Sequence, residues 1–149
     1  MDVERLRTRE IGVSANQSSD LSVGSGSANE TRLAIDDVSS PWFDDFGELD
    51  GAANELVLEH DSHHEIVAHG RMTQSSGAGE VWLRIYVNGV QRALDHMDVK
   101  NNGEATLSAS VYLKLDVGDK VWTTVEHNTG GTETFPGSDG GNFLSCVRQ

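Results

Sequence analysis

The chain is poor in cysteine and lysine, and it has no apolar run long enough to span a membrane. Its single cysteine, Cys146, excludes an internal disulfide and any metal site made only of cysteines. We expect this thiol to be a small buried core residue, because it lies in the apolar C-terminal stretch. Residues 1–10 lack the apolar segment of a signal peptide, which predicts synthesis in the cytoplasm.

Positive charge is also scarce, since 11 basic residues face 24 acidic ones and the formal net charge is −13 at pH 7. A chain that repels phosphate gains nothing from counterion release, which excludes nucleic acid and anionic membrane surfaces as partners. Carboxylates scattered along the chain keep a surface hydrated when salt screens their repulsion. The composition therefore favours a protein of a high-salt organism or its virus, with an ordinary acidic mesophilic protein as the alternative.

Helical periodicity is almost absent, and only residues 1–8 and the stretch around 44–53 are candidates for a turn or two of helix. Elsewhere apolar and polar residues alternate, as a strand with one face on a core requires. Residues 81–87 carry apolar side chains at every odd position, and residues 105–115 repeat this pattern. The chain therefore consists mainly of short strands.

Polar turns separate these strands. Asn88-Gly89 lies between two alternating runs, and Asn-Gly is the strongest short hairpin signal because both residues tolerate positive φ. A Gly-Asp pair at 118–119 ends another run. About ten short strands with such turns predict a single all-β antiparallel jelly-roll sandwich over residues 13–149, preceded by an N-terminal extension over residues 1–12.

No motif marks an active site, because neither G-x-S-x-G nor a phosphate-binding loop is present, and we expect no enzyme activity and no cofactor. The histidine-rich stretch 60–69 contains ligands for a transition metal. On a strand only residues two apart share a face, so a solvated turn with titratable histidines is the favoured reading, and a metal site stays open. The acidic pairs 36–37, 44–45 and Asp116 with Asp119 match no calcium-binding loop, and we expect solvated carboxylates there.

The aromatic residues carry information about assembly. Trp82 and Tyr86 share the face of their strand opposite to Leu83, and Trp122 points away from Val121 on its own strand. A strand that is apolar on both faces lies between two layers or contacts a neighbouring subunit. Partial cover by loops of the same chain is the alternative.

Residues 111–125, "VYLKLDVGDKVWTTV", resemble the late strand pair of the C1q/TNF-like jelly roll, in which an alternating strand ends in Gly-Asp and leads into a V-x-V strand. Residues 56–72 are similar to that family's strand around a D-G-x-Y-type turn, residues 83–89 to its next strand and hairpin, and residues 142–149 to its closing strand. The resemblance covers about residues 30–149. Without a collagen-like stalk, the chain looks most like the C1q-like modules of tailed-virus structural proteins.

This resemblance implies a homotrimeric, non-enzymatic virion protein that decorates the capsid, forms a turret, or serves as a fibre or receptor-binding module. The expected location is the virion, and the expected partners are neighbouring capsid or tail proteins, with host surface glycans as a further candidate. By the same analogy, the residues near the threefold axis are Met72, Tyr112 and Phe143. A soluble carbohydrate-binding module is the main alternative, and a small hydrolase with an unrecognised site is a third.

The N-terminal extension holds the basic cluster Arg5, Arg7 and Arg9 on an otherwise acidic chain. It has no apolar stripe long enough to join the core. We expect this segment to reach out from the base of the trimer and to dock on an acidic neighbour through Arg–carboxylate contacts. A frayed terminus is the alternative.

Overall fold

The computed structural model describes residues 12–37, 49–50, 53–59, 61–137 and 141–149. These residues form short and long strands and one turn of 3-10 helix, η2 (Ser27–Asn29). The strands are β1 (Gly12–Gln17), β2 (Leu21–Val23), β3 (Thr31–Arg32), β4 (Ile35–Asp37), β5 (Leu49–Asp50), β6 (Glu55–Val57), β7 (Ser62–Met72), β8 (Gly79–Val87), β9 (Val90–Val99), β10 (Ala105–Leu115), β11 (Lys120–His127), β12 (Glu133–Phe135) and β13 (Phe143–Arg148). Within this part of the chain, no helix is long and apolar enough to cross a membrane.

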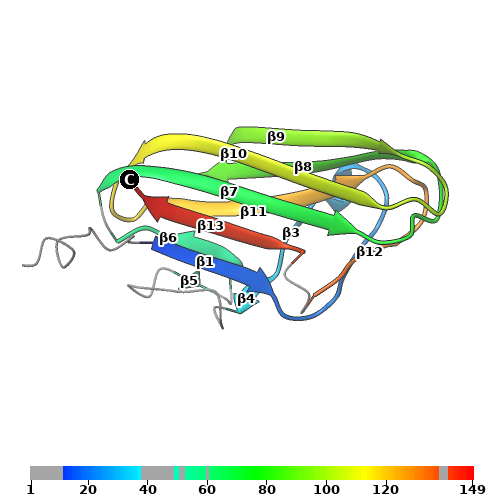
Figure 1. Cartoon of the computed structure of the whole chain (residues 1–149), viewed down its shortest axis with the longest axis horizontal. Coiled ribbons are helices and arrows are strands. Elements are labelled where there is room, and N and C mark those ends of the chain that lie inside the picture. The colour runs from blue at the N-terminus through cyan, green and yellow to red at the C-terminus, as the bar shows by residue number, and fades with distance from the viewer. Residues whose placement is uncertain (1–11, 38–48, 51–52, 60, 138–140) are drawn as a thin grey trace, which may run out of the picture.

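Two antiparallel sheets pack face to face. The first sheet has the strand order β10-β7-β13-β1-β4, and the second has the order β5-β6-β11-β8-β9, with β3 added beside β11. In Figure 1 the first sheet lies in front of the second. A small third sheet pairs β12 with β2. The predicted all-β antiparallel sandwich of about ten strands is therefore confirmed.

The alternating pattern of β7 and β10 decides which of their side chains enter the core. The two strands pair along their whole length, from Met72 opposite Ala105 to Ser62 opposite Leu115. Ile66 and Ala68 point inward with Met72 and are fully buried, whereas the odd-numbered residues of β7 point to the outside. Each long strand thus gives one face to the core and one to the surface.

The sharpest local prediction concerned the Asn88-Gly89 turn. The structure has a hairpin there, in which Val87 pairs with Val90 and the two turn residues have φ of 50° and 84°. Two consecutive positive φ values are what a tight two-residue hairpin needs, and Asn and Gly adopt them most easily. The prediction is confirmed.

The Gly-Asp turn at 118–119 has a different role from a hairpin turn. It joins β10 to β11, but β10 belongs to the first sheet and β11 to the second, so the chain crosses between sheets here. The N–H of Gly118 donates to the carbonyl of Leu58, and an Asp119 carboxylate oxygen accepts from the N–H of Asp116. The crossover is therefore held by its own backbone and side chains.

Three expectations about single segments can be compared with the structure. Cys146 is 0% exposed and lies in the core, as predicted. Met72 is also 0% exposed, because the even-numbered positions of β7 face the second sheet, so the expectation that it lies at a trimer axis is corrected. In the stretch around 44–53, residues 49–50 form a strand instead of a helical turn, pairing with β6, while 44–48 and 51–52 lie outside the described residues.

Candidate functional site

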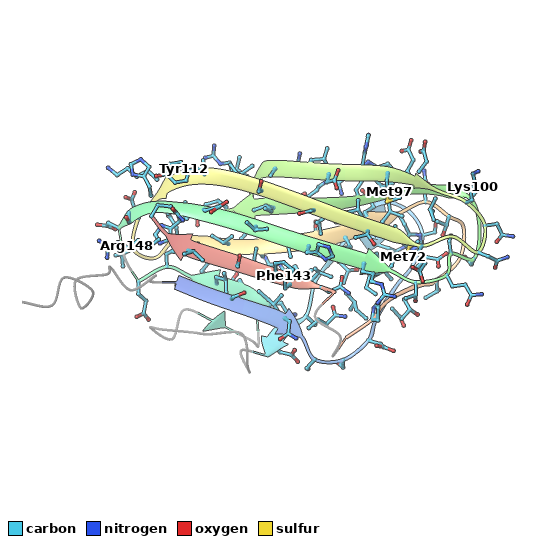
Figure 2. The ribbon with its side chains drawn as sticks, in the orientation of Figure 1. Met72, Met97, Lys100, Tyr112, Phe143 and Arg148 are labelled. Atoms are coloured by element: carbon cyan, nitrogen blue, oxygen red, sulfur yellow. The ribbon has the colours of Figure 1, made fainter. Side chains whose placement is uncertain are left out.

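The outward side of the first sheet is the surface that we call the first-sheet face. It is made of the outward residues of β7, β10 and β13. These are His63, Glu65, Val67, His69, Arg71, Thr106, Ser108, Ser110, Tyr112, Lys114, Phe143, Ser145 and Val147. On neighbouring β1 the outward Ser14 and Asn16 are only 4% and 6% exposed, so the outward side of the sheet is covered there. Figure 2 shows this face toward the viewer, with Tyr112 and Phe143 labelled on it.

Small and apolar residues occupy the middle of the first-sheet face. Val67 lies at its centre, opposite Ser110 on one neighbouring strand and Ser145 on the other. Tyr112, one row away, is 58% exposed. An exposed tyrosine beside a valine and two serines is the kind of side chain that is enriched at surfaces that contact a partner.

Two ring pairs stiffen this face. The His63 and Tyr112 rings stack with centroids 5.4 Å apart and planes inclined by 13°, and the His69 and Phe143 rings stack at 5.4 Å and 4°. His69 is further fixed by a contact of 2.6 Å between its Nδ1 and the carbonyl oxygen of Gly141, in which the ring nitrogen donates. Because both pairs join neighbouring strands, their rings are positioned before any partner arrives.

The first-sheet face carries little net negative charge. Its charged residues are Glu65, Arg71 and Lys114, and Arg71 lies 3.8 Å from the Glu104 carboxylate at the rim. On a chain with a formal charge of −13, a face with more cations than carboxylates is unusual. It is a surface on which copies of the chain can meet without bringing their acidic residues together.

The outward side of the second sheet, the second-sheet face, has a different chemistry. Its central residues are Trp82, Arg84, Tyr86, Leu94, Trp122, Thr124 and Glu126, with Glu30 and Arg32 lying over them. The Tyr86 and Trp122 rings stack at 5.8 Å and 11°, and the Arg32 guanidinium lies 4.0 Å from the centroid of Trp122. The Tyr86 and Trp122 rings are therefore partly covered by the chain itself. Contact of this face with a neighbouring subunit stays a prediction.

Arg84 organises this face electrostatically. Its Nη1 lies 2.7 Å from Glu126 and 3.5 Å from Glu30, and the side chain is only 16% exposed. The Tyr86 hydroxyl donates to Glu30 at 2.8 Å, and the Thr124 hydroxyl donates to the same oxygen at 2.6 Å. Burial raises the pKa of Tyr86, and the Glu30 carboxylate raises it further. The second-sheet face is a closed network with few groups left for a ligand.

The structure places the predicted assembly residues unevenly. Tyr112 and Phe143 both lie on the first-sheet face, in different rows, and Met72 lies beneath it in the core. Whether Tyr112 and Phe143 meet a second copy stays a prediction. Arg5, Arg7 and Arg9, predicted to anchor the chain, lie outside the described residues.

The histidine-rich stretch is divided by the strand. His63 and His69 point outward, His64 is buried on the inner side, and His60 lies outside the described residues. Of the acidic pairs, Asp36 accepts hydrogen bonds from the backbone and hydroxyl of Ser18. Among the residues that the structure describes, no group of three His, Cys, Asp or Glu is arranged to hold a metal ion.

Sequence reasoning missed a buried polar cluster at one end of the sandwich. Glu133, 2% exposed, accepts hydrogen bonds from the backbone N–H of Ser76 at 2.9 Å, from its hydroxyl, and from the hydroxyl of Thr129. Burial alone would raise the pKa of Glu133, but these hydrogen bonds outweigh it and lower that pKa. The hydrogen-bonded residues lie up to 57 positions apart in the sequence, so no local sequence pattern predicts the cluster.

A solved structure has a similar fold. The chain is similar to the structure of Eiger TNF from S. frugiperda, with a TM-score of 0.62 and 14% sequence identity over 94% of this chain and 92% of that one. The fold is thus a TNF-like jelly roll. The sequence matches no protein-family model and none of the curated proteins.

Proposed function

We propose that this chain is a non-enzymatic structural protein of a virion and acts as a homotrimer. The observation that carries the trimer is the first-sheet face: exposed Tyr112, a central Val67 with flanking serines, and low negative charge on an acidic chain. A second copy of the same chain is the partner that this surface fits, because burying it removes apolar area from water without joining carboxylates. The threefold arrangement is proposed from the resemblance to C1q/TNF-like modules.

The trimer also agrees with the resemblance between this sequence and C1q/TNF-like modules, which are typically trimeric. The first-sheet face includes Tyr112 and Phe143, the two surface residues that this resemblance points to. Both rings are held by stacking on His63 and His69, so little side-chain freedom is lost when a second copy packs on them.

The virion location rests on a different line of support. The chain resembles the stalkless C1q-like modules of tailed-virus structural proteins, and its formal charge of −13 fits a host with a salty cytoplasm. The role proposed is a capsid decoration or turret protein, or a fibre or receptor-binding module, with neighbouring capsid or tail proteins as partners. Trimers of such modules present one surface to the particle and another to the outside.

The direct experiment combines a mass measurement with particle analysis. Light scattering at micromolar concentration in molar KCl is expected to give three times the mass of the chain, 16.1 kDa. Mass spectrometry of purified particles is expected to find the chain in stoichiometric amount. A monomer under these conditions contradicts the trimer, and absence from particles together with glycan binding by the free protein favours the soluble carbohydrate-binding module.

The N-terminal extension provides a second arm of this experiment. Deleting residues 1–10 removes Arg5, Arg7 and Arg9, and the remaining trimer is expected to fold but not to incorporate into particles, because the Arg–carboxylate contacts to an acidic neighbour are lost. A variant with Lys at these three positions keeps the charge and is the matched control. Normal incorporation of the deleted chain refutes the anchor and leaves the trimer intact.

A further inference from the structure

Two histidines of β7 point outward onto the first-sheet face. The His63 ring stacks on Tyr112 near one end of the strand, and the His69 ring stacks on Phe143 toward the other end. Figure 2 labels both of these aromatic partners. Histidine is the side chain whose charge ordinarily changes between pH 5 and pH 8, so the charge of the first-sheet face depends on pH.

The hydrogen bond of the His69 ring decides where a second proton is added. Its Nδ1 lies 2.6 Å from the carbonyl oxygen of Gly141, and a carbonyl oxygen can only accept, so Nδ1 carries the proton of the neutral ring. The added proton therefore goes to Nε2. Within the part of the chain that the structure describes, neither His69 nor His63 forms an ion pair with a carboxylate. A second proton on either ring has no anion in place to balance it.

A second proton on His63 enters a region that already holds a cation. Lys114 of β10 lies directly opposite His63, and Glu65 is the next outward residue on β7. Beyond the end of β13, Gln149 donates its backbone N–H to the His63 carbonyl. Lys114 and Glu65 offset each other, so protonation of His63 leaves this part of the face with a net positive charge.

The surroundings of His69 lead to the same result. Arg71 is the next outward residue on β7, and its guanidinium lies 3.8 Å from the Glu104 carboxylate at the rim. On β10, Ser108 pairs with His69, and its N–H donates to the Asp95 carboxylate of β9 at 2.9 Å. Both nearby carboxylates therefore have partners of their own, and a protonated His69 adds a further cation beside Arg71.

We infer that the first-sheet face is a pH-sensitive contact between copies of this chain, from which the subunits separate when His63 and His69 are protonated. This inference rests on the proposed trimer and says how that assembly is regulated. In a separate chain water solvates the charged rings, whereas between subunits they lose water and lie among like charges. The assembled state therefore holds fewer protons than the separate chains. Linkage then requires the trimer to weaken as the pH falls through the range in which histidine takes up protons.

The test measures the mass of the full chain by light scattering over a dilution series in molar KCl, in half-unit steps from pH 7.5 to pH 5.5. We expect a trimer at pH 7.5. The chain concentration at which half of the trimer has separated should rise at least about tenfold by pH 5.5, because each excluded proton weakens assembly tenfold per pH unit below the histidine range. The slope against pH counts the excluded protons without any variant, and a slope below one proton per subunit overturns the inference.

Two variants locate the effect. The double variant His63→Gln/His69→Asn removes both titratable rings, and the Asn amide can donate to the Gly141 carbonyl as Nδ1 does. We expect its assembly to be independent of pH over this range. His96→Gln is the matched control, because His96 is an exposed histidine on the second-sheet face, opposite Trp82. This variant should separate in acid as wild type does.

The fold is followed by circular dichroism of the same samples, because His64 and His127 are buried and acid can also act on them. We expect the folded spectrum to persist at pH 5.5. Unfolding at that pH, an unchanged trimer at that pH, or a double variant that separates as wild type does each overturns the inference and leaves the trimer at pH 7.5 intact. A wild-type monomer at both ends of the pH range refutes the proposed trimer and this inference together.

Discussion

The two outward faces of this sandwich follow the same strand alternation but differ in how far their central side chains are exposed. On the second-sheet face, the Arg84 side chain is 16% exposed and is enclosed by Glu126, Glu30 and aromatic rings. On the first-sheet face, Tyr112 is 58% exposed, pairs with Glu65 and is covered only on one side, by the His63 ring. Alternation therefore decides which side chains point outward, but the cover supplied by other segments decides whether a face is complete within one chain.

That cover comes from a short segment that the second sheet has and the first lacks among the described residues. Residues 30–32 run beside β11, which brings Glu30 and Arg32 onto Trp122 and Thr124. These contacts cover part of the Trp122 ring, whose other neighbour is the Tyr86 ring. The Tyr112 ring of the first-sheet face stacks on His63 of the same sheet and is 58% exposed, so its outer side stays available to a second copy.

The largest expected effect comes from placing a charge on the incomplete face. Val67→Glu puts a carboxylate at the centre of the first-sheet face, between Ser110 and Ser145, where no cation lies directly opposite. An unpaired charge buried between subunits costs about 3–5 kcal/mol per copy. We expect the variant to be a folded monomer, and light scattering in molar KCl measures this.

Leu94→Glu is the matched control for that substitution. Leu94 points outward from β9 on the second-sheet face and is 47% exposed, so its replacement adds the same charge to the face that needs no partner. We expect this variant to remain a trimer. If Leu94→Glu dissociates the assembly and Val67→Glu does not, the two faces have been assigned the wrong way round.

The second-largest expected effect comes from removing the Arg84 cation at the centre of the second-sheet face. Arg84→Met removes the cation that lies 2.7 Å from Glu126 and 3.5 Å from Glu30, leaving carboxylates close together in a poorly solvated place. We expect the free energy of unfolding to fall by about 2–3 kcal/mol, while the oligomeric state is kept. Denaturation of Arg84→Met beside the double variant Arg84→Met/Glu126→Leu checks the cause, since removing the stranded carboxylate should restore part of the loss.

Some features of the two faces could be predicted from the sequence. Periodicity correctly predicted that the odd-numbered residues of 81–87 face the core, and the Asn88-Gly89 turn followed from the φ preferences of two residues. Met72 was misplaced because family analogy was followed at a position where the strand period itself points inward. Local pattern, when it is this regular, was the better guide.

What the sequence did not reveal depends on contacts between distant segments. The stacking of Arg32 on Trp122 and the three hydrogen bonds to Glu133 join residues that no periodicity relates. The assignment of β10 and β11 to different sheets is of the same kind, because a Gly-Asp turn fits both a hairpin and a crossover. The second-sheet face and the buried Glu133 cluster therefore became visible only in the folded chain.

Salt should act on the whole acidic surface more than on either face alone. At low ionic strength the excess carboxylates repel one another, and in molar KCl the Debye length shrinks to about 3 Å. We expect the melting temperature and the trimer fraction to rise together from dilute buffer to molar KCl. A melting temperature that is independent of salt removes the argument for a halophilic host and leaves the fold untouched.

The smallest expected effect uses the two tyrosines of the chain, one on each face. Tyr86→Phe removes the hydrogen bond of 2.8 Å to Glu30 on the second-sheet face, and we expect the free energy of unfolding to fall by about 1 kcal/mol. Tyr112→Phe, for which no side-chain hydrogen bond is found among the described residues, should leave the unfolding of the chain unchanged.

The raised pKa of Tyr86 also predicts how its contribution to stability changes with pH. The folded-state pKa lies above the ordinary value near 10. The stability that Tyr86 contributes is therefore present below pH 10 and is lost as the pH rises through the folded-state pKa. Thermal melts of wild type and both variants between pH 8 and pH 11 measure these differences. The stability difference between wild type and Tyr86→Phe should narrow at the alkaline end. Equal losses of stability in the two variants would show that the Tyr86 hydroxyl contributes no more than the Tyr112 hydroxyl.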